Sequence, residues 1–291
     1  MFIDIHVHVR RSHCAPRHGK QGFCVPEQLL ERYDAIGVER GVLLPLVSPE
    51  FYEPQANEDI IEIAREHPDR FIPFCNIDPR MLSNSADSPL GETLGYYRDQ
   101  GCKGVGEVTA NLPWADPMVQ NLLKHVEDVG FPLTFHIGPQ VGGVYGLVDA
   151  PGLPDLEASL QRFGKLRFLA HSTSFWAEMG PLRQPDDRFG YPDYSFDEEG
   201  VVPKLFRRYG NLYGDLSAGS GYNALARNPD YAVEFLNEFQ DRLLFGTDIT
   251  SFDTKTPLVN LILELRDSGR ISEAVFVKVA RENAVALLEL D

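Results

Sequence analysis

The amino-acid sequence predicts an α/β fold of the (β/α)8 or TIM-barrel class, in a single domain over residues 1–291. Three observations favour this class. Short apolar runs rich in β-formers alternate with segments of helical apolar spacing, as in repeated βα units around a parallel sheet. The runs number eight, the number of strands in such a barrel. Histidine or aspartate ends several runs, and barrel active sites assemble at those strand ends.

The eight runs supply the predicted strands in chain order. They lie at Phe2 to Val9, Gly41 to Val47, Phe71 to Ile77, Lys103 to Val108, Pro132 to Ile137, Leu166 to His171, Leu212 to Leu216 and Arg242 to Thr247. Helical spacing predicts helices between them. The clearest are Pro26 to Ile36, Asn57 to His67, Pro117 to Val129, Leu156 to Phe163 and Tyr231 to Phe239. We expect Ile271 to Leu290 to supply the last helical layer through an amphipathic or buried face.

The connections after the strands differ in length, and the longest runs from Ser172 to Gly200. It carries the side chains of Trp176, Met179, Arg183, Arg188, Tyr191 and Tyr194. A long connection over a barrel mouth is typically a lid or a substrate wall. A surface insertion or a subunit contact is an equally good interpretation, because aromatic residues and arginine concentrate at interfaces. The sequence therefore leaves a homodimer open.

The composition limits the classes of partner. The formal net charge of -16 would repel a phosphate backbone, so we expect neither nucleic acid nor an anionic membrane surface as a partner. The segment from Met1 to His6 lacks the basic and apolar regions of a signal peptide, and no apolar run approaches the roughly 20 residues of a membrane helix. We expect a cytoplasmic protein that acts on a small molecule.

The chain contains four cysteines, Cys14, Cys24, Cys75 and Cys102. They are too few for a disulfide scaffold in a chain of this length, and a reducing compartment fits them best. Cys14 and Cys24 lie near His13 and His18, which makes a small zinc loop an alternative. We do not favour it, because the spacing contains no tight Cys-x-x-Cys pair.

Two histidines stand at the carboxyl end of the first predicted strand, in Asp4-Ile5-His6-Val7-His8. Residues two apart in a strand point to the same side, so His6 and His8 would present both imidazoles on one face. Adjacent imidazoles are typical metal ligands. Alone, a His-x-His pair is as often a chance or surface pair.

Three further polar residues end other predicted strands: His136, His171 and Asp248. A lone histidine at such a position is more often a hydrogen-bonded structural residue. The carboxyl ends of barrel strands meet at one face, however, so these side chains would gather with His6 and His8. The sequence predicts a metal site there.

At these residues the sequence resembles the amidohydrolase superfamily, and within it the metal-dependent hydrolases related to aminocarboxymuconate semialdehyde decarboxylase. The resemblance spans nearly the whole chain. It rests on Ile3-Asp4-Ile5-His6-Val7-His8, Phe135-His136, Ala170-His171-Ser172 and Leu244-Phe245-Gly246-Thr247-Asp248. It implies that His6, His8 and His136 bind one divalent metal, that Asp248 completes the shell, and that His171 lies beside the activated water.

The chemistry agrees with that implication. Imidazole and carboxylate ligands suit zinc best, and also manganese, iron or cobalt. A metal lowers the pKa of a bound water toward about 7. Asp248 could accept the proton of that water, and His171 could orient the nucleophile or stabilise charge on the substrate.

The fourth predicted strand departs from the pattern of many two-metal members, which carry a carboxylated lysine there. In Lys103-Gly104-Val105-Gly106-Glu107-Val108, a glutamate ends the strand and Lys103 lies near its start. Glu107 could bridge a second metal, form a salt bridge, or orient a ligand histidine as an outer acceptor. We favour one ion over two.

Other polar residues receive less weight. Asp78, Asp215 and Ser217 lie around strand ends, where loop or helix caps explain them. Arg10, Arg11 and Arg17 follow the first strand and could clamp a substrate carboxylate, although solvated loop arginines are the simpler interpretation.

The leading hypothesis is hydrolysis of a C–N or C–O bond in a small substrate by metal-activated water. The alternative enzyme is a non-oxidative decarboxylase of a small unsaturated or aromatic acid, which would need a carboxylate clamp near the metal. The positions of Arg10, Arg11, Arg17 and Arg183 relative to His171 would discriminate between them. From another class, a non-catalytic metal- or ligand-binding barrel is disfavoured, because a passive site needs no proton acceptor beside an open position.

Overall fold

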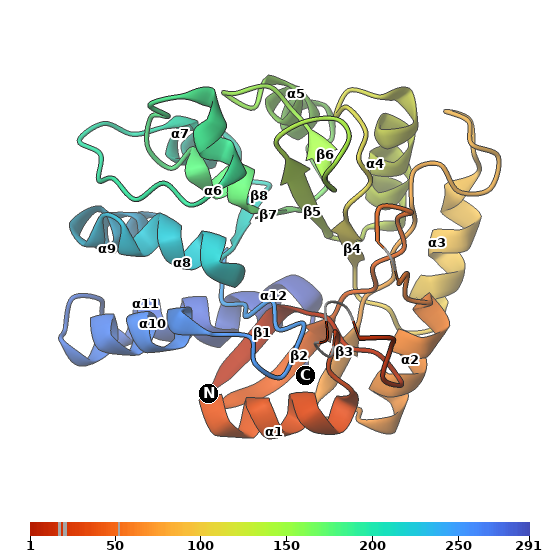
Figure 1. The fold of residues 1–291 in the computed structure, drawn as a ribbon, viewed down its shortest axis with the longest axis horizontal. Coiled ribbons are helices and arrows are strands. Elements are labelled where there is room, and N and C mark those ends of the chain that lie inside the picture. The colour runs from red at the N-terminus through yellow and green to blue at the C-terminus, as the bar shows by residue number, and fades with distance from the viewer. Residues whose placement is uncertain (17–18, 20–21, 52) are drawn as a thin grey trace.

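The computed structural model describes residues 1–291 except 17–18, 20–21 and 52. Within the described residues, eight parallel strands form the centre of the molecule and helices lie around them (Figure 1). The strands are β1 (Phe2–Val7), β2 (Val38–Leu43), β3 (Phe71–Pro73), β4 (Val105–Val108), β5 (Leu133–Gly138), β7 (Phe168–His171), β8 (Leu212–Asp215) and β9 (Leu243–Leu244). A short strand, β6 (Leu147–Val148), pairs with β5 beside the barrel.

The strands pair in two sheets, ordered β1-β2-β3 and β4-β5-β7-β8-β9. Backbone hydrogen bonds connect the sheets at both seams. Between β3 and β4, the amide of Gly106 donates to the carbonyl of Cys75 at 2.9 Å. Between β9 and β1, the amide of Ile5 donates to Phe245 at 3.0 Å, and that of Asp248 to His6 at 2.8 Å. The predicted TIM-barrel class is confirmed.

The helices cover the outside of this barrel. They are α1 (Pro26–Ile36), α2 (Asn57–Glu66), α3 (Leu90–Asp99), α4 (Pro117–Val129), α5 (Pro154–Arg162), α6 (Thr173–Ala177), α7 (Val201–Arg208), α8 (Ala218–Ala226), α9 (Pro229–Glu238), α10 (Pro257–Asp267), α11 (Glu273–Val277) and α12 (Asn283–Leu288). The 3-10 helix η1 (Pro185–Phe189) and the π-helix η2 (Lys278–Glu282) complete the set. Among the described residues, no helix has both the length and the apolar character needed to cross a bilayer.

Apolar side chains fill two layers of core. The smaller cluster lies among the strands and includes Ile3, Ile5, Val42, Phe74 and Leu169. The larger cluster packs the outer face of the strands against the helices. Because both faces of the strands are buried, the sequence shows continuous apolar runs and not a polar alternation.

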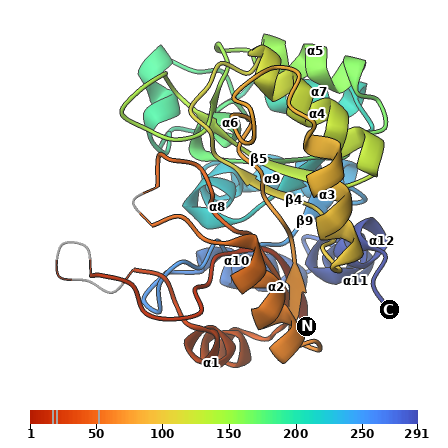
Figure 2. The same ribbon diagram turned by 90° about the vertical axis from the view of Figure 1, so that its right-hand side faces the viewer.

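The connections after β1 and β2 leave the barrel on one side, and the C-terminus lies on the other (Figure 2). The long connection from Ser172 to Gly200 contains two short helical elements, α6 and η1. Its tryptophan, Trp176, is buried and donates through Nε1 to the carbonyl of Asp215 at 3.0 Å. This part of the connection therefore packs into the barrel wall.

Candidate metal centre

A register shift in β1 turns the first two histidines toward the site. Ile3 and Ile5 belong to the cluster among the strands, whereas Asp4 points outward and accepts from the hydroxyl of Tyr33 at 2.8 Å. The pairing of β1 with β2 is irregular between Asp4 and Val7. Such an irregularity re-aims side chains, and here it leaves His6 buried among the strand ends.

His6, His8 and Asp248 bring three donor atoms together. The Nε2 atoms of His6 and His8 lie 3.0 Å apart. Oδ1 of Asp248 lies 3.6 Å from the first and 3.4 Å from the second. The prediction that His6 and His8 share a face agrees with this geometry. Asp248 is held in the left-handed region at φ 55°, which is costly for a residue other than glycine and is typical of functional sites.

The other ring nitrogen of each imidazole has its own partner. Nδ1 of His8 lies 2.8 Å from the carbonyl oxygen of Leu44, which can only accept, so this nitrogen carries hydrogen. Nδ1 of His6 lies 2.6 Å from Oδ2 of Asp215 and donates to that carboxylate. The two Nε2 atoms are therefore the ones available to a metal.

Glu107 contributes a carboxylate that faces two ways. Its Oε2 lies 3.6 Å from Nε2 of His6 and 3.4 Å from Nε2 of His8. Its Oε1 lies 2.7 Å from Nδ1 of His136 and 3.7 Å from Nε2 of His171. Burial would raise the pKa of this carboxyl, but hydrogen bonds from His136, His6 and His8 outweigh burial and hold the pKa well below its usual range. Glu107 thus lies between the two pairs of histidines.

His136 and His171 end neighbouring strands and are directly paired in register. The ring of His136 lies against that of Tyr145, with 4.6 Å between centroids. The backbone of Gly146 approaches the same imidazole so closely that a Cβ there would lie 2.8 Å from its Cδ2. With φ at +102°, Gly146 occupies a conformation that other residues rarely adopt. The loop after β5 therefore confines the His136 ring.

His171 is buried, and its Nδ1 atom has two polar neighbours. Its Nδ1 lies 2.9 Å from Oγ of Ser217 and 3.5 Å from Oδ2 of Asp215. Asp215 was explained from the sequence as a cap, and this interpretation was incomplete, because its side chain contacts two site histidines. The sequence offered one signal, since Asp215 ends a strand as His171 does.

The candidate substrate arginines lie elsewhere, as far as the structure describes them. Arg10 donates to the carbonyl of Glu53 at 3.0 Å, and exposed Arg11 pairs with glutamates of α2. The guanidinium of Arg183 lies 3.9 Å from the centre of the Tyr194 ring in an exposed part of the long connection. Arg17 falls outside the described residues. None of the three described arginines forms a hydrogen bond or an ion pair with the site histidines.

A cavity of about 550 Å³ opens beside His136. Tyr145, Ser174, Arg188 and Phe189 also line it. Arg188 is 3% exposed, and its Nη1 donates to the carbonyl of Asp149 at 2.8 Å. From the sequence, Arg188 was identified only as part of the long connection, yet this arginine lines the same cavity as His136.

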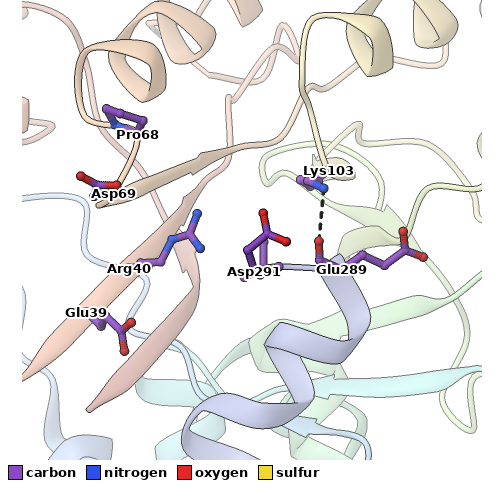
Figure 3. A pocket seen from close by; sticks show the side chains of 8 residues that line it. Glu39, Arg40, Pro68, Asp69, Lys103, Glu289 and Asp291 are labelled. Carbon is purple, nitrogen blue, oxygen red and sulfur yellow. Dashed lines mark hydrogen bonds between the residues drawn. The ribbon is translucent and has the colours of Figure 1, made fainter.

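A second cavity of about 500 Å³ lies at the other end of the barrel (Figure 3). Lys103, which precedes β4, and Arg40 of β2 line it together with the C-terminal residues Glu289 and Asp291. Nζ of Lys103 donates to the carbonyl of Glu289 at 3.5 Å. Because barrel enzymes react at the carboxyl ends of their strands, this cavity does not mark the functional site.

The zinc loop considered around Cys14 and Cys24 gains no support. Burial raises the pKa of the Cys24 thiol to about 11, although the positive charge of Arg32 opposes the shift. Among the described residues, no cluster of three possible metal ligands includes Cys14 or Cys24. His18, the second histidine of that alternative, lies outside the described residues.

The donor set fits a divalent transition metal. Four donors arranged tetrahedrally at about 2.1 Å from a zinc ion lie about 3.4 Å from one another. The distances among His6, His8, Asp248 and Glu107 given above range from 3.0 to 3.6 Å. Without a metal ion or a proton between them, the lone pairs of the two Nε2 atoms would face each other and two carboxylates.

The amidohydrolase family model matches residues 3–290. No curated protein sequence is significantly similar to the chain. Similar solved structures include an uncharacterized TIM-barrel protein from Bordetella bronchiseptica, with 20% identity and a TM-score of 0.64 over 91% of this chain and 83% of that one. A probable 2-pyrone-4,6-dicarboxylic acid hydrolase from Acinetobacter baumannii, with citric acid bound, has 14% identity and a TM-score of 0.59 over 99% of each chain.

A third structure is a 5-carboxyvanillate decarboxylase from Novosphingobium aromaticivorans, complexed with manganese and 4-hydroxy-3-methoxy-5-nitrobenzoic acid. It has 16% identity and a TM-score of 0.57, over 91% of this chain and 80% of that one. At these identities the structural likeness shows the fold alone. Because the family match spans nearly the whole sequence, the chain belongs to the amidohydrolase family.

Proposed function

We propose that this protein is a metal-dependent hydrolase that uses metal-activated water to cleave a C–N or C–O bond in a small molecule. One observation carries the proposal: the Nε2 atoms of His6 and His8 lie 3.0 Å apart and within 3.4 to 3.6 Å of carboxylate oxygens of Asp248 and Glu107, beside His136 and His171. The cavity lined by His136 gives a substrate access to this side of the cluster.

We propose one divalent ion, zinc in the first place and manganese, iron or cobalt otherwise. His6, His8, Asp248 and Oε2 of Glu107 would hold it. His136, which the family resemblance places among the ligands, meets Oε1 of the same glutamate, so its proposed contribution is to complete or orient the shell. The manganese found in the 5-carboxyvanillate decarboxylase supports a site suited to a divalent transition metal.

The bound metal would supply a Lewis acid that makes water a nucleophile near neutral pH. Asp248 would accept the proton, because its side chain is the most exposed carboxylate of the cluster, at 25%. Burial would raise the pKa of Asp248, but the hydrogen bond from His8 and the nearby positive charges outweigh it. Asp248 is then ionised and ready to act as a base.

His171 would orient the nucleophile or stabilise charge on the substrate. Its Nδ1 is occupied by Ser217, so Nε2 is the atom that faces the cluster. Tyr145 and Phe189 would form apolar walls of the substrate cavity. We also propose one domain over residues 1–291; a cytoplasmic location and a homodimer remain predictions.

Decarboxylation of a small unsaturated or aromatic acid is the second candidate, and Arg188 favours it. This buried guanidinium lines the cavity next to His136, as a carboxylate clamp would. Glu178 lies 3.2 Å from its Nε, however, and already balances its charge. Hydrolysis therefore stays the first proposal, and a non-catalytic barrel the third.

Elemental analysis followed by a substrate screen tests the proposal. We expect about one equivalent of transition metal, and turnover of a lactone, an ester or an amide that disappears on chelation and returns with added metal. Release of carbon dioxide from a carboxylic acid without hydrolysis would establish the second candidate. Metal binding with no turnover of any of these classes would favour the third, and a chain that takes up no metal would overturn both proposed enzymes.

A further inference from the structure

Asp215 is a buried carboxylate at the end of β8 that sequence reasoning assigned to loop capping. Its side chain is 0% exposed. One oxygen, Oδ2, lies 2.6 Å from Nδ1 of His6 and 3.5 Å from Nδ1 of His171. The other oxygen, Oδ1, accepts the amide hydrogen of Ser217 at 3.0 Å. A cap needs only the last of these contacts.

The surroundings of Asp215 hold its carboxylate in place. Nε1 of Trp176 donates to the carbonyl of the same residue at 3.0 Å. Gly246 lies so close that a Cβ there would be 2.9 Å from Oδ1 and 2.7 Å from Cβ of Ser217. A glycine just after the neighbouring strand, β9, is thus needed for the carboxylate to reach both histidines.

The hydrogen-bond partners of this carboxylate are all donors. An ionised carboxylate only accepts, so each imidazole nitrogen that bonds to it must carry hydrogen. Neutral histidine has one N–H, and fixing it at Nδ1 leaves a lone pair on Nε2. In His6, Nε2 is the atom that meets His8, Glu107 and Asp248.

We propose that Asp215 is a positioning residue of the metal centre: its Oδ2 accepts the hydrogen on Nδ1 of His6, its negative charge 3.5 Å from Nδ1 of His171 favours hydrogen there too, and both Nε2 atoms so turn toward the metal and the substrate. Ser217 shares this task for His171 only, through Oγ at 2.9 Å. The inference rests on the proposed metal site. It adds that one carboxylate orients a ligand and the acid–base histidine together.

The isosteric variant Asp215→Asn tests this role, because it introduces an NH2 group where all neighbours are donors. If its oxygen keeps the amide of Ser217, the NH2 group faces His6 and disfavours hydrogen on Nδ1. We expect the zinc affinity of the purified chain, measured by chelator competition, to fall by about 10-fold to 100-fold, the usual effect of losing an outer partner of a ligand histidine.

Nitrogen-15 NMR of the zinc-loaded protein supplies a readout that a merely structural role would not change. We expect wild type to show Nδ1–H signals for His6 and His171, and Asp215→Asn to shift both. The control Asp149→Asn makes the same change at a buried carboxylate that accepts only backbone amides of residues 150, 155 and 156. It should leave the zinc affinity and both signals unchanged.

Ser217→Ala separates the two histidines and remains informative even if Asp215→Asn does not fold. It should shift the His171 signal, keep the His6 signal and change the zinc affinity less than about twofold. Wild-type zinc affinity and unshifted signals in Asp215→Asn, or a Ser217→Ala variant that shifts the His6 signal, would overturn the inference. A wild-type chain that binds no zinc would instead defeat the proposed function.

Discussion

Zinc binding to the metal-free protein should release protons, because the paired histidines hold a proton where the metal would bind. Nδ1 of His8 donates to a carbonyl, and Nδ1 of His6 donates to a carboxylate. The one N–H of each neutral ring is therefore already used at Nδ1, and Nε2 can donate only if the ring takes up a second proton. The two Nε2 atoms are 3.0 Å apart, which is a hydrogen-bond distance only if one of them carries hydrogen. In the metal-free state, at least one of these imidazoles is therefore cationic.

The pKa of His8 sets the size of the effect. Burial lowers this pKa, but hydrogen bonds to Asp248 and Glu107 outweigh burial and raise it to about 9. At pH 7 only about 1% of such a group is deprotonated, which costs about 2.7 kcal/mol of metal-binding free energy. The apparent zinc association constant should therefore rise about tenfold per pH unit from pH 7 and level off near pH 9. The pKa of His6 is also raised, because contacts with Asp215 outweigh burial.

Calorimetric titration at pH 7 in buffers of different ionisation enthalpy counts the released protons. We expect one or more per zinc bound. His67→Ala removes a histidine at the end of α2, whose ring packs on Phe71, and should release the same number. No proton release at pH 7, together with an affinity that is constant from pH 7 to 9, would refute the reasoning.

The raised pKa of His8 also predicts how the stability of the metal-free protein depends on pH. The folded-state pKa of His8 lies above the unfolded value of about 6.5, so its protonated form stabilises the fold. This contribution is fully present below about pH 6.5 and is lost as the pH rises through about 9. The melting temperature of the metal-free protein should fall across that window, and that of the zinc-loaded protein should fall less.

Three further predictions concern the roles of individual residues. His171→Ala should keep near-normal zinc content and lose about 10² to 10⁴ in turnover, as when a positioned acid or base is removed; normal turnover, or loss of the metal, would contradict its role. Asp248→Asn should bind zinc more weakly and lose turnover; wild-type turnover would exclude it as the base. The double variant His6→Ala, His8→Ala should contain no stoichiometric metal by elemental analysis, and full occupancy would place the ligands elsewhere.

The barrel was predictable because burial on both faces makes its strands apolar runs that stand out from amphipathic helices. The run that contains His136 and the run that ends at His171 became paired strands with these residues in register. Two helices that are not among the clearest predicted ones have weaker patterns. α8 contains two glycines in Ala218–Ala226, and α3 contains Gly91 and Gly95, which lower the intrinsic helix propensity of both segments.

The positions of the site residues along the strands were predictable, but their partners were not. Strand ends predicted that His6, His8, His136, His171 and Asp248 would gather. Pattern alone does not reveal which nitrogen of an imidazole faces inward, because that depends on contacts between strands far apart in the sequence. The contact between His6 and Asp215 spans 209 residues, and no local spacing encodes it.

Glu107 shows why the two oxygens of one side chain matter for the chemistry. Its Oε2 faces His6 and His8, and its Oε1 faces His136 at hydrogen-bond distance. An ion bound on the Oε2 side leaves His171 free, since Nε2 of that histidine lies 3.7 Å from Oε1 and has no closer carboxylate contact among the described residues. A histidine consumed as a ligand could not also exchange protons with the substrate. The one-ion arrangement therefore keeps a histidine available for acid–base work, and a second ion on the Oε1 side would leave that task to Asp248 alone.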